Sequence, residues 1–453
     1  KKEKFMKVNY FSRIGFILAV SGSAIGLGNI WKFPYMVGEM GGSAFVLVYL
    51  LTVALIGISL LIAEMVIGNY SRSDSITSFE KISRNNKTAW KFVGFSSFSG
   101  LLILTFYSVV IGWIFYYIIK ALTQNLSVSL ATSEETFSGF LQNDILSQMF
   151  FHLISVLLIC AIVYKGIKKG IETTNLLMMP LLFIIFLGLL FYSISLPTFG
   201  KAWHFLFDYD FAKIDSNTLL MAVGHSFFTL SIGMGAILTY SASSAKETNI
   251  FKDAVLVAFL DTAIALIAGL VIFTFLFGFT DKAAKGPGLV FISLPTAFAA
   301  MGAMGTLIAI FFFIALSFAA ITSAISILEP SIKIATERYK IGRKKAIMIF
   351  GAIVYIIGLM ALLSNSKDFS QILTFGSKNL FDWLDYLTTA ILLPIGGIAI
   401  SIFLGYFVPK EVLRNQLSRS MSTKVFDIWY FSIKFIAPIG VIFILLNESG
   451  LLG

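Results

Sequence analysis

The sequence predicts an all-α integral membrane protein of about 11 transmembrane helices, arranged as a 5+5 inverted repeat with broken helices 1 and 6. Three observations predict this fold class. The 453 residues are 57% hydrophobic and 13% charged, with a mean hydropathy of +0.88, which excludes a soluble enzyme with a polar surface. Apolar residues gather in stretches long enough to cross a hydrocarbon core, which takes about 20 residues. Glycine-rich interruptions fall in the first and the sixth stretch.

Eleven apolar stretches are separated by polar or charged loops. We expect each stretch to form a membrane-spanning helix, because a helix satisfies its own backbone hydrogen bonds in lipid. The expected spans are 11–37, 41–70, 90–123, 145–164, 169–195, 217–242, 250–279, 304–334, 344–364, 372–407 and 425–447. The first stretch is too long, and too polar at its centre, for a cleaved signal peptide.

Positive charge is unevenly distributed between alternate loops. Of the 34 Lys and Arg residues, 25 lie in the N-terminal segment and the loops on its side, 8 lie on the other side, and Lys434 lies inside the last span. Because cytoplasmic loops carry an excess of Lys and Arg, we expect a multi-pass protein of the cell membrane with a cytoplasmic N-terminus and Gly453 outside. The net charge of +10 therefore indicates orientation in membrane lipid and not a nucleic-acid partner.

Two spans contain residues that interrupt a helix. Span one reads SGSAIGLGNIWKFP at 21–34, and span six reads FFTLSIGMGAILTY at 227–240. Close helix packing is the alternative explanation for the glycines of either span alone. Breaks at corresponding positions favour two inverted repeats, 1–195 and 196–407, followed by an additional span within 408–453. Paired broken helices of this kind are typical of secondary transporters.

The segment GSAIGLGNIWKFPY, with GGSAF at 41–45, resembles the neurotransmitter:sodium symporter family, and in particular its bacterial amino-acid transporters. The resemblance continues through 227–243, AAITSAISILEP at 319–330 and GIKKGIE at 166–172. It covers spans one to ten in order, and the GMG sequence is most similar to transporters of several hydrophobic amino acids. The resemblance implies sodium-coupled symport of neutral hydrophobic L-amino acids, aliphatic and aromatic, by alternating access.

The resemblance also implies two sodium sites built from oxygen ligands. The first combines the substrate carboxylate with Ala24, Asn29, Thr229 and Asp261. Many relatives have Asn in place of Asp261, and a protonated Asp261 bonded to a neighbour is the alternative to a sodium ligand. The second site consists of Gly22, Ile25, Ala319, Thr322 and Ser323. For its two hydroxyls the alternative is bonding within their own helical turn.

The implied substrate pocket separates polar from apolar groups. The amides near Leu27 and Gly28 and the hydroxyl of Tyr107 would hold the carboxylate. The full set of implied pocket residues is Ala24, Leu27, Gly28, Ile103, Tyr107, Phe228, Thr229, Ser231, Gly233, Met234, Ser323 and Ile327. We expect the glycines that flank Met234 to leave room for a bulky side chain. Ordinary core packing is the alternative for the aromatic residues.

The resemblance implies charged gates at both ends of this pocket. The outer gate is Lys32 with Asp385. The inner gate consists of Lys7, Tyr10, Ser243 and Glu337. Ser243 stands where a Tyr is usual, so we expect the inner network to be incomplete, and simple surface ion pairs are the alternative. The intramembrane acid Glu64 is expected to pack against the break of span one.

Two other functions were weighed against symport. A membrane amino-acid sensor or a ligand-gated pore could use the same pocket. We would expect a sensor to carry an additional signalling domain and a pore to have a continuous polar helix face, and the sequence indicates neither. We expect no enzyme, because His152, His204 and His225 lack metal-ligand spacing. Animal members of the family bind chloride near the first sodium, and here we expect chloride not to be required because Asp261 supplies the charge. Protonation of Asp261 on the empty return step would couple transport to proton counter-movement.

Overall fold

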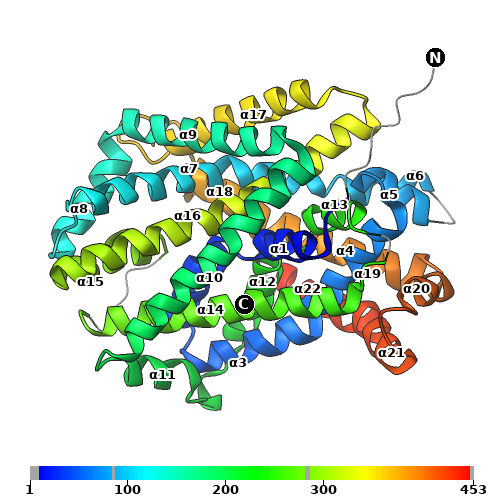
Figure 1. Cartoon of the computed structure of the whole chain (residues 1–453), viewed down its shortest axis with the longest axis horizontal. Helices are drawn as coiled ribbons and strands as arrows, with labels where there is room; N and C mark the ends of the chain where they lie inside the picture. Colours follow the sequence, from blue (N-terminus) through cyan, green and yellow to red (C-terminus); the bar gives the residue numbers. More distant parts are fainter. Residues whose placement is uncertain (1–9, 84–86, 246, 281–285, 449–453) are drawn as a thin grey trace.

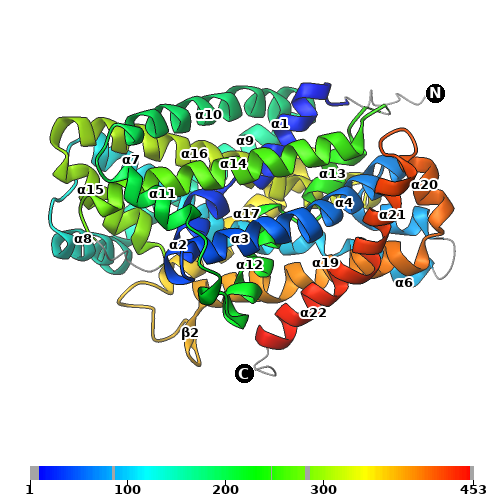
Figure 2. The ribbon, with the colours of Figure 1, turned by 90° about the horizontal axis from the view of Figure 1, so that it is seen from below.

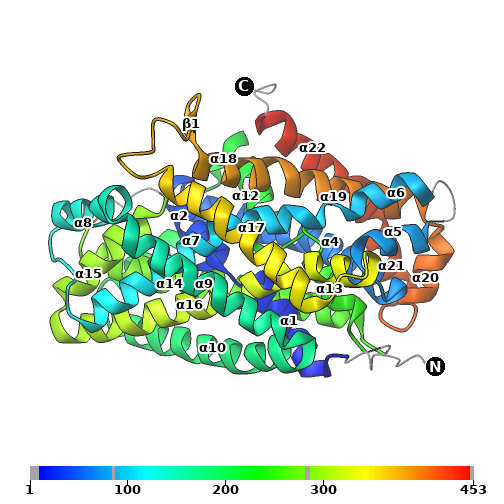
Figure 3. The ribbon, with the colours of Figure 1, turned by 90° about the horizontal axis from the view of Figure 1, so that it is seen from above.

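The computed structural model describes residues 10–83, 87–245, 247–280 and 286–448. They form an elongated bundle whose helices run side by side along the longest axis (Figure 1). Helices α8 and α15 lie at one end of the bundle, called here the α8 end. Helices α5, α6 and α20 lie at the other, the α5 end, where α1 also begins (Figures 1 and 3).

The first half of the chain forms helices at all five predicted spans. Their bounds are α1 Arg13–Ala24, α2 Phe33–Glu39, α3 Ser43–Thr52, α4 Ile58–Ser71, α6 Lys87–Gly94, α7 Ser97–Leu122, α9 Ile145–Tyr164 and α10 Thr173–Ile194. Wider π-helical turns join or precede some of them, at Gly28–Lys32, Val53–Gly57 and Ile167–Glu172. Between the spans lie three shorter helices, α5 Ser75–Ile82, α8 Leu130–Asn143 and α11 Phe199–Phe207.

The second half continues in the same way. Its helices are α12 Ser216–Thr229, α13 Ala236–Ala242, α14 Ile250–Phe277, α15 Leu294–Ala300, α16 Gly302–Lys333, α17 Arg343–Leu363, α18 Leu380–Tyr386, α19 Leu393–Ile402, α20 Lys410–Leu417, α21 Thr423–Phe431 and α22 Ala437–Glu448. A 3₁₀ turn covers Phe211–Lys213, and π-helical turns cover Leu289–Ser293, Ile334–Arg338, Leu387–Leu392, Phe403–Phe407 and Ser432–Ile436. In Figure 2, α21 and α22 run obliquely from the α20 side of the bundle down to its lower edge.

Polar side chains begin several of these helices. The hydroxyl of Ser12 accepts a hydrogen bond from the Gly15 amide at 3.0 Å at the start of α1. The carboxylate of Asp215 accepts one from the Thr218 amide at 2.6 Å at the start of α12. This bond stabilises the ionised form and lowers the pKa of Asp215, which lies on the surface before the helix.

The exact number of eleven spans is not confirmed by the lengths of the helices. In the described residues nine helical stretches are long and apolar enough to cross a membrane, and the bent pair α1 and α2 makes a tenth. The predicted sixth span falls outside this count because its halves, α12 and α13, have only 14 and 7 residues. The predicted start of span ten at 372 is wrong. Residues 374–379 form the short antiparallel hairpin of β1 (Thr374–Phe375) and β2 (Lys378–Asn379), and the helix begins at Leu380.

Both predicted helix breaks are confirmed. The axes of α1 and the Gly28–Glu39 segment differ by 47°, and residues 230–235 separate α12 from α13. The two breaks lie together at the centre of the bundle, where α1 packs against α10, α13, α14 and α16. The inverted symmetry between the two halves stays a prediction.

Candidate functional site

The two broken helices are joined through backbone and side-chain groups at their breaks. Ser231 has a positive φ of 54°, and its hydroxyl donates to the Ser23 carbonyl at 2.7 Å. Glu64, fully buried on α4, accepts hydrogen bonds from the amides of Gly233 at 2.7 Å and Leu238 at 3.3 Å. These bonds connect Glu64 to the sixth break, whereas its expected packing against the first break stays a prediction. The interrupted sixth span leaves amide donors without helical partners, and this carboxylate satisfies two of them.

Asp261 of α14 is fully buried between both breaks. Its Oδ1 accepts from Asn29 Nδ2 at 2.8 Å, and its two oxygens lie 3.2 and 3.1 Å from Thr229 Oγ1. Tyr49 donates to Oδ2 at 3.4 Å. Among the described residues no Lys or Arg pairs with this carboxylate, although a buried anion needs a positive partner. The structure thus brings together three of the four residues expected at the first sodium site, Asn29, Thr229 and Asp261.

The expected second sodium site lies where α1 faces α16. A Cβ on Gly22 would be 3.1 Å from Thr322 Cβ, so these two residues are in contact range. The Thr322 hydroxyl donates to the carbonyls of Phe318 and Ala319 in its own helix, at 2.9 and 3.1 Å. This is the bonding within one helical turn that is the alternative to a sodium ligand. The Ser323 hydroxyl instead crosses to the Ser23 carbonyl on α1 at 3.2 Å. Both oxygens keep lone pairs that could bind a cation.

A small pocket lies between the breaks and helices α7 and α16. Its lining is Ala24, Gly26, Leu27, Gly28, Ile103, Tyr107, Phe228, Ser231, Met234, Ser323 and Ile327. Ten of the twelve residues expected to contact substrate therefore surround one space. At its polar side the Leu27 amide donates to the Tyr107 hydroxyl at 3.2 Å. The rest of the lining includes the apolar side chains of Ile103, Met234 and Ile327, so the pocket suits a ligand with one charged end and one apolar end.

Two expected residues do not line this pocket. Thr229 points to Asp261 instead. Gly233 has a φ of +87°, and a Cβ there would lie 2.5 Å from the Leu393 carbonyl oxygen of α19. The prediction that Gly233 sets the volume available to a bulky substrate is therefore not supported by the geometry. This glycine permits the left-handed backbone and the close approach of α19.

A larger cavity adjoins the pocket on the side of the α8 end. Leu27, Tyr107 and Phe228 line both spaces, so these side chains separate them. The expected gate residues Lys32 and Asp385 both line the larger cavity. In the described part of the chain no ion pair within 4.0 Å joins them, and the Lys32 ammonium lies 4.6 Å from the centre of the Phe228 ring.

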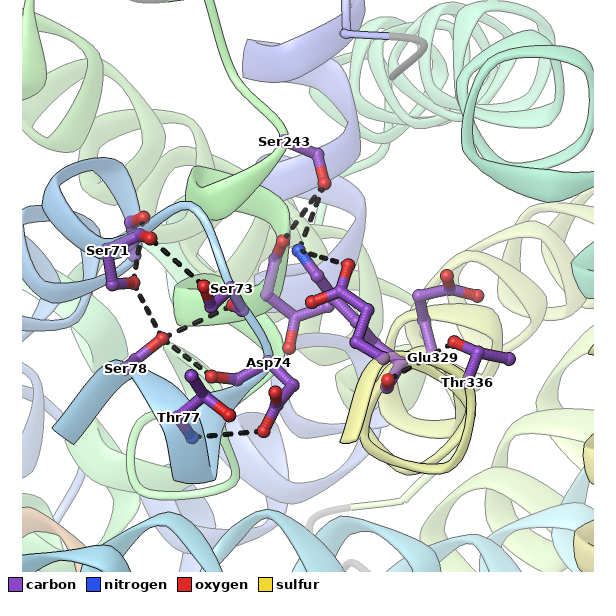
Figure 4. Close-up of polar contacts among 12 residues, drawn as sticks. Ser71, Ser73, Asp74, Thr77, Ser78, Ser243, Glu329 and Thr336 are labelled. Atoms are coloured by element: carbon purple, nitrogen blue, oxygen red, sulfur yellow. Dashed lines mark hydrogen bonds and ion pairs between the residues drawn. The ribbon is translucent and has the colours of Figure 1, made fainter. Parts of the chain in front are cut away.

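Polar contacts gather at the α5 end on α4, α5, α13 and α16, as Figure 4 shows. The buried Lys333 donates to the Ser243 hydroxyl at 3.4 Å and lies 3.9 Å from Glu337. The Phe11 amide donates to the Ser243 carbonyl at 3.0 Å. The expected gate residues Ser243 and Glu337 are thus connected through Lys333. Of the other two, Lys7 lies outside the described residues.

Tyr10 contacts a second cation at this end. The Arg72 guanidinium lies 5.7 Å from the Tyr10 ring and donates to the carbonyls of Ser244 and of Ala245, the latter at 3.3 Å. Burial lowers the pKa of Arg72. Arg72, Lys333 and Tyr49 were not among the expected site residues. Lys and Arg are common at helix ends, so their charge alone does not indicate a site, and only the spacing of these residues from the helix breaks could have indicated one.

Known proteins share this architecture. The model of the sodium:neurotransmitter symporter family matches residues 7–138 and 139–449. An uncharacterised sodium-dependent transporter of Bacillus subtilis is 35% identical over 98% of each chain, and one of Haemophilus influenzae is 34% identical over 96% of this chain and 97% of its own. The crystal structure of MhsT in complex with L-phenylalanine has a TM-score of 0.88 and 38% identity, and it covers 97% of this chain and 99% of its own. The chain belongs to the sodium:neurotransmitter symporter family of sodium-dependent membrane transporters, and it is not an enzyme.

Proposed function

We propose that this transporter carries neutral hydrophobic L-amino acids, both aliphatic and aromatic, by symport with sodium. The observation that carries this proposal is the pocket at the two helix breaks, whose lining is polar at one side and apolar elsewhere. The Leu27 amide and the Tyr107 hydroxyl can bind a carboxylate at one side, while Ile103 and Ile327 offer an apolar surface to a side chain. MhsT, which shares the fold, was solved with L-phenylalanine, and this supports an aromatic amino acid among the substrates.

Two sodium ions accompany the substrate in this proposal. The first ion binds Ala24, Asn29, Thr229 and Asp261 with the substrate carboxylate, so the affinities for ion and substrate are coupled. The second binds Gly22, Ile25, Ala319, Thr322 and Ser323, where the Ser323 hydroxyl already bonds to the Ser23 carbonyl of α1. Chloride is not required, because Asp261 places a carboxylate at the first site, and a second anion beside it would be repelled.

Transport follows from opening the two ends of the bundle in turn. The α8 end, with its larger cavity, faces outside, and the α5 end, with its network around Lys333, faces the cytoplasm. The excess of Lys and Arg in the loops of the α5 end supports this orientation, with the N-terminus inside and the C-terminus outside the cell membrane. One bundle of helices, drawn from the repeats 1–195 and 196–407, would rock against a scaffold around the central pocket.

Uptake into proteoliposomes tests this function. Radiolabelled phenylalanine, tryptophan, leucine and alanine are offered with an inward sodium gradient or with the same gradient of potassium or choline. We expect accumulation of the hydrophobic amino acids only with sodium. Equal accumulation in potassium would contradict sodium coupling, and sodium-driven uptake confined to polar amino acids would contradict the substrate class.

A further inference from the structure

Lys434 is an ionisable residue of the last span that the proposed transport cycle does not use. It lies in the π-helical turn Ser432–Ile436 between α21 and α22. A Cβ on Gly405 would be 3.1 Å from the Lys434 Cα, so the two residues are level with each other. Gly405 is followed after two residues by Phe407, where span ten ends at the α5 end. Lys434 therefore lies only about 3 Å inside that helix end.

Three aromatic rings surround the Lys434 ammonium. Its Nζ lies 4.9 Å from the ring centre of Tyr406, 5.5 Å from that of Phe435 and 5.8 Å from that of Tyr430. Ring faces attract a cation but do not neutralise its charge. The ion pairs of the described residues include no carboxylate bound to Lys434.

The neighbouring charges are already balanced. Asp427 lies 2.7 Å from Lys410 and 3.1 Å from Arg414, and the exposed Glu411 lies on the same short helix α20. The two bases Lys410 and Arg414 are therefore matched in number by the two acids Asp427 and Glu411, and Lys434 supplies the excess positive charge. The Lys410 ammonium also lies 5.1 Å from the Tyr430 ring, so one tyrosine lies between two cations.

We propose that Tyr406, Lys410, Tyr430 and Lys434, the Lys434 patch, bind the phosphate of an anionic phospholipid in the leaflet at the α5 end. The charge and the position of the patch both fit a lipid headgroup, because an anionic leaflet attracts basic residues near its surface and aromatic residues concentrate there. The acyl chains have an apolar surface beside the patch. Phe431 and Phe435, on the same helix face, are 56% and 43% exposed in the isolated chain.

Native mass spectrometry of the full chain in detergent, titrated with phosphatidylglycerol or phosphatidylcholine, tests this site. We expect preferential retention of phosphatidylglycerol. Lys434→Gln keeps the length of the side chain without the charge, and it should weaken phosphatidylglycerol retention about fivefold while leaving phosphatidylcholine unchanged. Lys434→Arg should retain the lipid. Lys424→Gln, at an exposed lysine one turn before Asp427, is the matched control and should behave as the original chain.

Three results would overturn the proposal: equal retention of both lipids, an equal loss in Lys424→Gln, or full retention in Lys434→Gln. Displacement by millimolar inorganic phosphate would also contradict it, since that result indicates an anion site without lipid specificity. A photoactivatable phosphatidylglycerol on the unmutated chain keeps the test independent of variant folding. Its adducts should map to the peptide 428–436, and adducts confined to other segments would contradict the site.

Discussion

At the scale of single residues, the polar side of the pocket depends on one hydroxyl. Tyr107 is buried on α7 and accepts from the Leu27 amide at 3.2 Å, which leaves its own proton for a substrate carboxylate. Tyr107→Phe should therefore lower phenylalanine affinity about tenfold or more, since a hydrogen bond to a charged group contributes roughly 1.5–3 kcal/mol. Scintillation-proximity binding in saturating sodium measures this.

A matched control lies on the same helix. Tyr117 is also buried, but its hydroxyl donates to the Phe291 carbonyl at 2.7 Å, away from the pocket. Tyr117→Phe should lower thermal stability with substrate affinity unchanged. If both variants lost affinity equally, the Tyr107 hydroxyl would have no specific role in substrate binding.

Asp261 carries the second residue-scale prediction. The original chain should take up substrate equally well in sodium gluconate and sodium chloride, because its own carboxylate provides the negative charge beside the first sodium. Asp261→Asn keeps the size of the side chain and should raise the sodium concentration for half-maximal uptake about tenfold or more. Uptake by this variant should also depend less on pH, and chloride should increase it. If uptake by the original chain ceased in sodium gluconate, Asp261 would not replace the chloride ion.

At the scale of elements, the positions of both helix breaks could be predicted from glycine content, but their internal geometry could not. Gly233 and Gly235 indicated an interruption, whereas the direction each residue faces depends on backbone angles such as the φ of 54° at Ser231. A left-handed Ser in one position turns the following residues toward α19. For the same reason the contact of Glu64 with the sixth break was missed, since nothing in its own span indicates which amides it satisfies.

Gly233 provides a test of this geometry. An alanine there would need a φ of +87° and would bring its Cβ to 2.5 Å from the Leu393 carbonyl. Gly233→Ala should cost about 2–4 kcal/mol of stability, from backbone strain and overpacking together. Thermal melting in detergent measures the loss. Gly224→Ala in α12 is the control, because nothing lies within 4 Å of its added Cβ, and a selective loss of tryptophan binding at unchanged stability would instead favour the pocket role.

At the scale of the whole molecule, the long apolar stretches predicted the bundle well because lipid leaves a helix as the stable backbone structure. The predicted bounds of a span were wrong where an apolar stretch does not form a helix. Residues 372–375 continue the hydrophobic pattern of span ten, yet they lie in a loop and in β1 of the β1–β2 hairpin. Contacts between distant segments, such as Arg72 with the end of α13, have no local signal. They are set by the packing of α4 against α13, where Gly68 allows the backbones to touch.

These distant contacts hold the α5 end closed, and they provide the last prediction. Arg72 joins three elements, since it donates to the carbonyls of Ser244 and Ala245 after α13 and contacts the Tyr10 ring before α1. A state open at the α5 end must break these contacts, so Arg72→Gln should shift the population toward it, by about tenfold for a loss of roughly 1.5 kcal/mol. A pocket cysteine, Ile103→Cys in a Cys160→Ala background, reports this shift through its labelling rate by a membrane-impermeant thiol reagent applied at the α5 side. The exposed Lys345→Gln at the same end should leave the rate unchanged, whereas an unchanged rate in Arg72→Gln would mean that the Lys333 network alone keeps this end shut.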